Sequence, residues 1–296
     1  MTAFSPISAA LEGLRVMRRE PKAVLYWIAV WALALAAIGA IKALGGGPAA
    51  APGGRDALSL IRSYGPLATV LAPMLVALSI MNTATVYRAV LRPGEHGWHL
   101  FKLGADEARI AVLSLVGAIL LIVANVLLWF FLEGPAGVLF ALFGPISTVV
   151  PAVNLIIAGL GAAATVFLEI WVGVRLSLAP VQTFAERGFP IDSYWDLTRG
   201  NFWRLYAAYL LVVCEIALFF LLLGILGLVL APLSMLVLHW RGPVLARRVL
   251  ILTILVPLAA FSSGLLFVVP SVLIGGCRAF AYRAIAGART APVGQG

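Results

Sequence analysis

The chain has few charged residues, two cysteines and three histidines, and each shortage excludes a class of protein. Charged side chains make up 11 % of its 296 residues, whereas a soluble globular domain has about 25 %. Apolar residues make up 62 % of the chain, which is more apolar surface than a single core of this size can hide from water. The composition therefore predicts an integral membrane protein and excludes an ordinary soluble domain.

The cysteines and histidines give no pattern of a metal site or an enzyme. Cys214 and Cys277 lie far apart inside apolar runs, which predicts small buried residues and no disulfide framework. His96 and His99 have the spacing of metal ligands on a helix, but no cysteine is near them and we interpret them as solvated loop residues. The motifs GxSxG, HExxH and GK[S/T] do not occur. We therefore expect no enzyme activity, no metal and no cofactor.

Six apolar runs are long enough to cross a bilayer, which takes about 20 residues. They are predicted at Ala23–Leu44, Pro66–Val86, Ile110–Leu132, Val153–Val174, Leu205–Ala231 and Val249–Ile274. The expected fold class is all-α, a polytopic membrane helix bundle whose transmembrane domain occupies 23–287, with a flexible cytoplasmic tail over 288–296. The connection 133–152 is apolar, rich in Gly and Pro and free of basic residues, which predicts either a re-entrant or interfacial segment or a lid on the outer face.

Lysine and arginine are distributed unevenly between the two sides that these spans define. Fifteen flank the two termini and the second-to-third and fourth-to-fifth connections, and six lie on the other side. Because basic loops stay in the cytoplasm, both termini are predicted there. The basic residues adjoin apolar runs, so the net charge of +9 favours anionic lipid headgroups on the cytoplasmic side as partners and not nucleic acid.

Residues 1–22 are predicted to form an amphipathic interfacial helix. Ser5 is the expected N-cap, Pro6 occupies the first helical position, and Pro21 ends the helix. Its apolar face is expected to hold Ile7, Ala10, Leu11, Leu14 and Met17, with Glu12, Arg15 and Arg19 opposite. Such a helix lies in the cytoplasmic interface or packs on the other cytoplasmic segments.

Two apolar runs end in a similar pattern, YRAVLRP at 87–93 and VRLSLAP at 174–180. Their shared residues align as Arg88 with Arg175, Leu91 with Leu178 and Pro93 with Pro180. YRAI at 282–285 adds Arg283 as a third equivalent. Copies with the same orientation predict parallel internal repeats about an axis along the membrane normal. The alternative is that the basic residues at this interface anchor it by snorkelling: Arg88, Arg175, Arg204 and Arg283.

Short interfacial segments follow each of these two patterns, and a capped span comes next. Asp106 is predicted to cap the third span and Asn201 the fifth. Ser193 stands three residues before Asp196, a capping pattern for a short interfacial helix, which Gly200 is expected to end.

Polar side chains inside the spans are the remaining candidates for a site: Glu169, Glu215, Asn125 and Asn154. Asparagines can hydrogen-bond between helices as packing contacts. Glu169 lies about 9 Å deeper than Arg175 at 1.5 Å per residue, within reach of the interface or of Arg204. Glu215 lies about 20 Å from Asn201, near the predicted midplane, with no basic residue near it in sequence. An intramembrane carboxyl has either a structural hydrogen bond or a role with a substrate or proton.

Longer stretches of the chain carry a resemblance to a known group. SPISAALEG, HLFKLGADEARI and VRLSLAPVQTFAERGFPIDSYWDLTRGNFWRL, together with the six spans, resemble the bacterial YciC-like membrane proteins. They are also similar to the membrane domain that precedes some glycerophosphodiester phosphodiesterases, whose catalysis resides on a separate soluble barrel. The resemblance covers most of the chain and implies the fold more than an activity. It also implies that the chain lies in the bacterial inner membrane.

With no catalytic motif and a basic cytoplasmic face, we expect a non-enzymatic protein of the envelope or of lipid handling. The resemblance reaches only the membrane portion of the phosphodiesterases, so we expect no phosphodiesterase activity from this chain alone. The alternative is a transporter of lipids or small molecules, with a site near Glu169 and Glu215.

Overall fold

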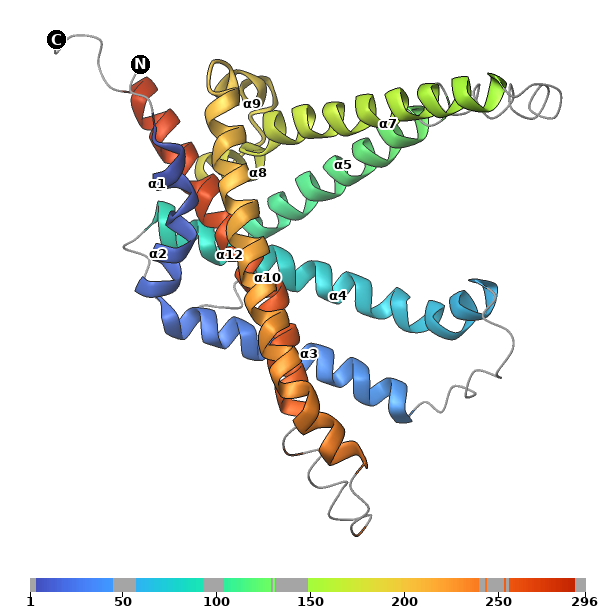
Figure 1. The fold of residues 1–296 in the computed structure, drawn as a ribbon. Coiled ribbons are helices and arrows are strands. Elements are labelled where there is room, and N and C mark those ends of the chain that lie inside the picture. The colour runs from blue at the N-terminus through green and yellow to red at the C-terminus, as the bar shows by residue number, and fades with distance from the viewer. Residues whose placement is uncertain are drawn as a thin grey trace. The chain divides into compact units, whose positions relative to one another are not determined.

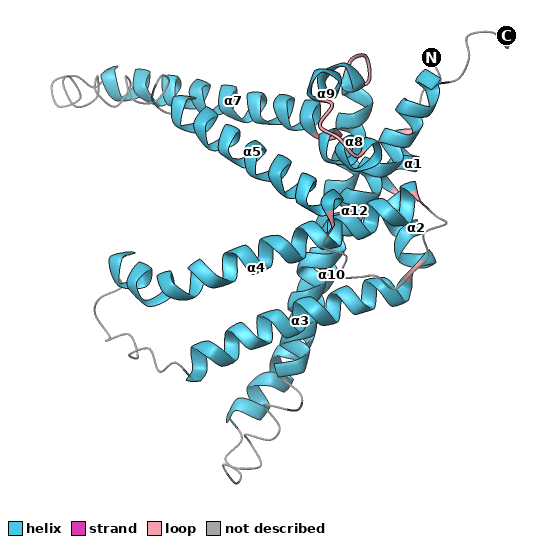
Figure 2. Cartoon of the chain, turned by 180° about the vertical axis from the view of Figure 1, so that it is seen from behind, coloured by secondary structure: helices cyan, strands magenta, loops and turns pink. Residues whose placement is uncertain are grey.

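A computed structural model describes residues 4–44, 57–92, 104–128, 130, 149–239, 243, 253 and 256–290. Over these residues the chain is helical and contains no strand, as the cyan ribbons of Figure 2 show. The helices, labelled in Figure 1, are α1 (Pro6–Ala10), α2 (Glu12–Arg19), α3 (Pro21–Leu44), α4 (Ala57–Leu91), α5 (Ala105–Leu128), α7 (Val149–Leu176), α8 (Ala179–Glu186), α9 (Ile191–Thr198), α10 (Phe202–His239) and α12 (Val256–Thr290). The predicted all-α fold class is confirmed.

Five of these helices are long and apolar enough to cross a membrane, and they are α4, α5, α7, α10 and α12. The pair Pro6–Arg19 and Pro21–Ala37, bent by 88°, raises the number to six if each bent pair is one span. Each predicted span falls on a separate long helix, as in a multipass membrane protein. The end of the third predicted span and the start of the sixth lie outside the described residues. The helices that hold the second, fourth and fifth spans exceed them at both ends, because hydropathy marks only the lipid-soluble part, whereas backbone hydrogen bonding continues beyond it.

The chain divides into two compact units. The first comprises Met1–Leu103 and Tyr206–Gly296, and the second comprises Gly104–Leu205. The division falls within the first turn of α10. Each unit has its own set of helix contacts and its own buried residues, so each is described by itself.

In the first unit, α12 is the central element, and it contacts α1, α2, α3 and α4. Small residues allow this close packing. A Cβ added to Gly276 of α12 would lie 2.7 Å from the Cα of Gly13 in α2, and one added to Gly264 would meet the carbonyl oxygen of Ile28 in α3. Small-residue contacts of this kind let helix backbones approach each other in membranes. The packing of the first unit therefore depends on glycines of α12.

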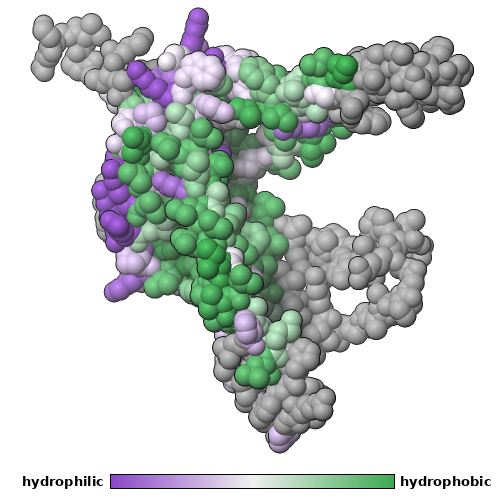
Figure 3. Space-filling view, viewed as in Figure 1, coloured by the Kyte–Doolittle hydropathy of each residue, from purple (hydrophilic) through white to green (hydrophobic). Residues whose placement is uncertain are grey.

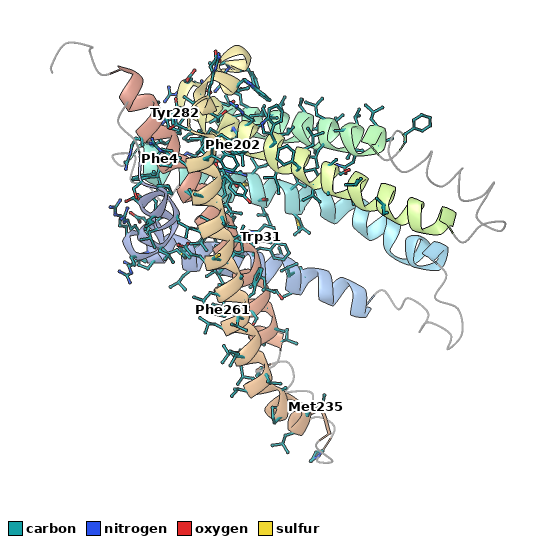
Figure 4. All side chains as sticks on the ribbon, turned by 45° about the horizontal axis from the view of Figure 1, so that its top comes forward. Phe4, Trp31, Phe202, Met235, Phe261 and Tyr282 are labelled. Carbon is teal, nitrogen blue, oxygen red and sulfur yellow. The ribbon has the colours of Figure 1, made fainter. Side chains whose placement is uncertain are left out.

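Larger side chains complete the contacts of α12. Trp31 of α3, labelled in Figure 4, stacks on Phe267 with ring centroids 4.6 Å apart. Asn82 of α4 is buried and donates to the Ser271 hydroxyl at 2.5 Å. Asn82 thus forms the interhelical hydrogen bond that asparagine side chains can make in membranes.

The N-terminal segment begins as predicted, but its buried face differs from the expected one. Ser5 caps α1 by accepting from the Ser8 amide, and Pro6 stands in the first turn. Glu12, placed on the outer face by the helical pattern, is only 2 % exposed, and its carboxylate pairs with Arg15 at 3.0 Å and with Arg19 at 3.6 Å. The reason is steric, because the side next to Glu12 carries Gly13, which alone fits against α12.

The larger apolar residues of this segment consequently remain uncovered. Ile7 is 61 % exposed, and Leu11 and Leu14 are also exposed. Apart from Glu12, the buried positions of α1 and α2 are small or medium residues, namely Ala9, Ala10, Gly13 and Val16, of which only Ala10 belongs to the predicted apolar face.

The second unit holds α5, α7, α8 and α9, in which α5 contacts α7 and α8, and α7 contacts α9. Its core residues lie on α8 and around it: Leu178, Val181, Phe184, Tyr194 and Leu197. Two capping predictions are wrong here. Gly104 precedes α5 and its amide donates to Glu107 at 3.0 Å, while Asp106 lies in the first turn and pairs with Arg109 at 2.8 Å.

Similarly, Pro190 and not Ser193 precedes α9. The Ser193 hydroxyl donates to the Pro190 carbonyl at 2.9 Å, so it serves the first turn from inside the helix. Both errors have one cause, because a polar residue near a helix start fits several positions of the first turn equally well in sequence. Gly200 follows α9 with a φ of +82°, as a residue that ends a helix does.

Candidate functional site

The four basic residues singled out in the sequence have different surroundings. Arg88 and Arg175 lie in the last turns of α4 and α7, whereas Arg204 is exposed near the start of α10. Arg283 donates from Nη1 to the carbonyl oxygen of Val90 at 3.3 Å, which fastens α12 to the end of α4. Arg175 has the least ordinary surroundings of the four.

Three aromatic rings surround the Arg175 guanidinium, and we name the group the Arg175 cluster: Arg175, Trp171, Trp195 and Phe202. The guanidinium carbon lies 5.8 Å from the ring centroid of Trp171, 5.2 Å from that of Trp195 and 5.9 Å from that of Phe202. Each distance is within the range of a cation–π interaction. Nε and Nη1 of Arg175 are buried and have no hydrogen-bond partner. The cluster therefore holds a positive charge against rings and not against a carboxylate.

Hydrogen bonds between α8 and α9 hold Trp195 in place. Thr183 and Tyr194 share a bond of 2.6 Å, and Gln182 donates to Ser193 at 2.6 Å. Burial raises the pKa of the Tyr194 hydroxyl, an effect that the bond with Thr183 opposes and the charge of Glu186 reinforces. The neutral phenol is thus the form that the fold favours, and it fixes α9 on α8.

Direct contacts also link α9 to the end of α7. The Thr198 hydroxyl donates to the carbonyl oxygen of Arg175 at 3.4 Å. The rings of Trp171 and Trp195 meet edge to face, with centroids 5.0 Å apart. The Arg175 cluster is therefore built from the ends of α7 and α9 and from the first residue of α10, which Figure 4 labels.

The predicted intramembrane polar residues do not form one group. The Asn125 amide donates to the Leu121 carbonyl of its own helix at 3.0 Å. Of the two alternatives for Glu169, the ion pair with Arg204 does not form within the described part of the chain, and the Glu169 side chain makes no hydrogen bond there. The side chain of Asn154 lies outside the described residues.

Glu215 of α10 faces a neighbourhood that the sequence did not indicate. Its Oε2 is buried without a hydrogen-bond partner, and the carboxyl is close enough to Cys277 of α12 for an electrostatic interaction. The next residue, Arg278, interacts electrostatically with Tyr87 of α4 and with Tyr209 of α10. A basic side chain thus lies beside the residue that Glu215 approaches, although none is near Glu215 in sequence.

Sequence reasoning missed the aromatic part of the Arg175 cluster and the role of Arg278. Trp171 precedes Arg175 by four residues, so helical spacing was a usable signal for that pair. Trp195 and Phe202 come from other elements and left no such signal. Arg278 was placed beyond the sixth span, which was predicted to end at Ile274, but α12 continues to Thr290.

Several sequence predictions fall on residues outside the described part: Pro93, His96, His99, the stretch 133–148 of the apolar connection and the last six residues. Among the described residues, no three His, Cys, Asp or Glu side chains are grouped so that they could hold a metal ion. The superposition of repeats that Arg88 and Arg175 suggest would relate helices of different units, so it stays a prediction.

No family model matches the chain, and neither a curated protein nor a solved structure matches it. The resemblance to YciC-like proteins accordingly stays a proposal, supported by the motifs quoted from the sequence.

Proposed function

We propose that the chain is a non-enzymatic, multipass protein of the bacterial inner membrane, of the YciC-like type. It works through contacts with lipids, and anionic headgroups on the cytoplasmic side are its partners. Both termini are cytoplasmic in this proposal. It rests most on one observation, which is the exposure of large apolar side chains along helices that carry basic residues at one end.

α5 and α10 illustrate this observation. Only 6 % of the apolar stretch of each helix is buried against protein. Side chains such as Leu115, Ile122 and Leu228 are mostly exposed. Arg109 lies near the start of α5, and Arg199 lies three residues before α10. Figure 3 shows the apolar surface that runs along α10 in green. Such faces suit acyl chains, and the basic residues suit the phosphates at the end of those chains.

The N-terminal helices support the same proposal. α1 and α2 turn by 88° from α3, so they lie along the membrane surface if α3 crosses the membrane. They expose Ile7, Leu11 and Leu14, and α2 also carries Arg18 and Arg19 in its last turn. An exposed apolar face next to basic residues is typical of a helix that lies in the headgroup region. Its opposite face packs on α12, so both interpretations of this segment from sequence find support.

A second candidate function is transport of a small molecule or lipid. The observation that favours it is Glu215, whose buried Oε2 has no hydrogen-bond partner and which lies near Cys277 and the Arg278 side chain next to it. A carboxyl without a partner at such a position is a functional candidate. The close packing of α12 on α1–α4 favours the first candidate for the rest of this unit.

Purification with bound lipids, followed by mass spectrometry, tests the proposal. We expect anionic phospholipids to be enriched in the protein fraction relative to the membrane from which it came. Lipids in bulk proportion would contradict the proposed partner. A small non-lipid molecule that purifies with the wild type and not with Glu215→Gln would favour transport instead.

A further inference from the structure

We propose that the Arg175 cluster is a binding site for the phosphate group of an anionic phospholipid, which Arg175 contacts through Nη2. The site combines a guanidinium enclosed by three rings with exposed aromatic side chains at the end of an apolar helix. This inference rests on the proposed function, because it assigns one lipid site within a protein that contacts lipids.

The first argument is the missing counter-charge. Among the described residues, Arg175 forms no ion pair and its side chain donates no hydrogen bond. Nε and Nη1 are covered by protein. Nη2 is not buried, so it is accessible from outside. An arginine held in this way can offer its open edge to one oxyanion.

The rings make that edge a stronger site than an ordinary surface arginine. Trp171, Trp195 and Phe202 exclude water from the faces of the guanidinium at 5.2 to 5.9 Å. A charge with less surrounding water interacts more strongly with an approaching anion, because the local dielectric constant is lower. The rings also hold the side chain in one orientation, so less conformational entropy is lost on binding.

The second argument identifies a lipid as the source of the phosphate. Trp195 and Trp203 are 41 % and 74 % exposed; Trp195 lies against Arg175 at the end of α7, and Trp203 is the second residue of α10. Tryptophan and other aromatic residues concentrate at the level of lipid headgroups. α7 itself exposes Ile156, Leu160 and Phe167 toward the other end. An acyl chain along α7 would bring its phosphate to the level of Arg175.

The third argument is that the fold holds the site in place. The bonds Thr183–Tyr194, Gln182–Ser193 and Thr198–Arg175 connect α8, α9 and α7 within 2.6 to 3.4 Å. These bonds position Trp195 and the Arg175 backbone together. A binding group that is positioned by packed helices needs little rearrangement for its ligand.

Arg204 provides a matched control on the same chain. It is exposed near the start of α10, and no cation–π contact of Arg204 occurs in the part of the chain that the structure describes. Its replacement by glutamine removes the same charge as Arg175→Gln. A general attraction of lipids to positive charge would therefore weaken equally in the two variants.

The experiment measures phosphatidylglycerol binding to the full chain in neutral detergent micelles by native mass spectrometry. Wild type, Arg175→Gln, Arg175→Lys and Arg204→Gln are compared, with thermal unfolding followed by circular dichroism as the check of folding. We expect Arg175→Gln to weaken binding roughly tenfold, as for the loss of one charge-assisted hydrogen bond. Arg204→Gln should change it by less than about twofold.

Competition separates the two sources of phosphate. Inorganic phosphate should not displace the lipid, because it lacks the acyl chains that α7 and the exposed aromatics contact. Displacement by inorganic phosphate at concentrations close to that of the lipid would overturn the lipid assignment. Equal losses in Arg175→Gln and Arg204→Gln, or an unchanged affinity in Arg175→Gln, would overturn the site.

If Arg175→Gln does not fold, Arg175→Lys decides the matter. Lysine keeps the charge but cannot lie flat between rings with one edge outward. A loss of about threefold or more supports the site, and wild-type affinity contradicts it. A failure of the site leaves the enrichment of anionic lipids on the wild-type protein unchanged, so it is distinguishable from a failure of the proposed function.

Discussion

α10 and α12 are both long apolar helices of the first unit, yet α10 is almost uncovered by protein, whereas the other helices of the unit pack around α12. One third of the apolar stretch of α12 is buried against protein, compared with 6 % of the apolar stretch of α10. α12 places Gly264, Gly275 and Gly276 against neighbouring elements, whereas the glycines of α10 have nothing within 4 Å of an added Cβ. Hydropathy therefore identifies both helices, but small residues at contact positions determine which one binds protein.

The largest effect is expected from a change at the closest contact of α12. Gly276→Leu would push the new side chain into the backbone of Gly13, 2.7 Å from its Cα and N. We expect a loss of stability of about 3 kcal/mol, or no folded protein, because backbone must shift. The control is Gly224→Leu on α10, where nothing lies within 4 Å. Thermal unfolding in detergent checks this, and equal effects of the two changes would remove the contrast between the helices.

A smaller effect is expected from the hydrogen bond between α4 and α12. Asn82→Leu keeps the volume of the side chain but loses the bond to Ser271. We expect destabilisation of about 1–2 kcal/mol, the range for interhelical bonds in membranes. Asn125→Leu is the matched control, since Asn125 donates only within its own helix. A larger loss in the control than in Asn82→Leu would contradict the assignment.

Next comes the basic residue of α12 that fastens the end of α4. Arg283→Gln removes the bond from Nη1 to the Val90 carbonyl, and about 1 kcal/mol of stability should be lost. Arg204→Gln on α10 removes the same charge from an exposed position and should cost less than about 0.5 kcal/mol. Denaturant titration measures the free energy of unfolding of the two variants, and Arg204→Gln should be the more stable of the two.

The smallest effect on stability is expected at the acidic residue of α10. Glu215→Gln keeps the shape and the acceptor of the side chain, so the unfolding midpoint should stay within the error of the wild type. Any transport activity would be lost in the same variant if the carboxyl handles a substrate or a proton. A large loss of stability would instead mean that Glu215 has a structural partner that the carboxyl alone can satisfy.

The sequence was sufficient to predict the six long helices and the all-α fold, because apolar runs of this length have few alternatives. The cap at Ser5 was also predictable, since the serine is followed directly by proline. The buried face of α2 was not. Helical periodicity ranks residues by polarity, whereas the fit of Gly13 against α12 depends on size and brings Glu12 inside with it.

The candidate sites were predictable only in part, for a related reason. Arg175 was identified by its position at the end of an apolar run, but Trp195 and Phe202 reach it from other elements. Arg278 lies near Tyr209, and Cys277 lies near Glu215, because the fold brings this part of α12 next to α10. Contacts between segments far apart in the sequence leave no trace in local periodicity, so they had to come from the structure.

The most direct test of the account is to measure what surrounds α10 and α12 in a bilayer. Spin labels are attached at position 221 of α10 or 272 of α12, in a background with both native cysteines replaced by alanine. Leu221 is 59 % exposed and Val272 is 2 % exposed. The account predicts strong relaxation by oxygen at 221, as in lipid, and little relaxation by oxygen or a water-soluble nickel complex at 272. Access of the nickel complex at 221, or equal protection at both positions, would contradict it.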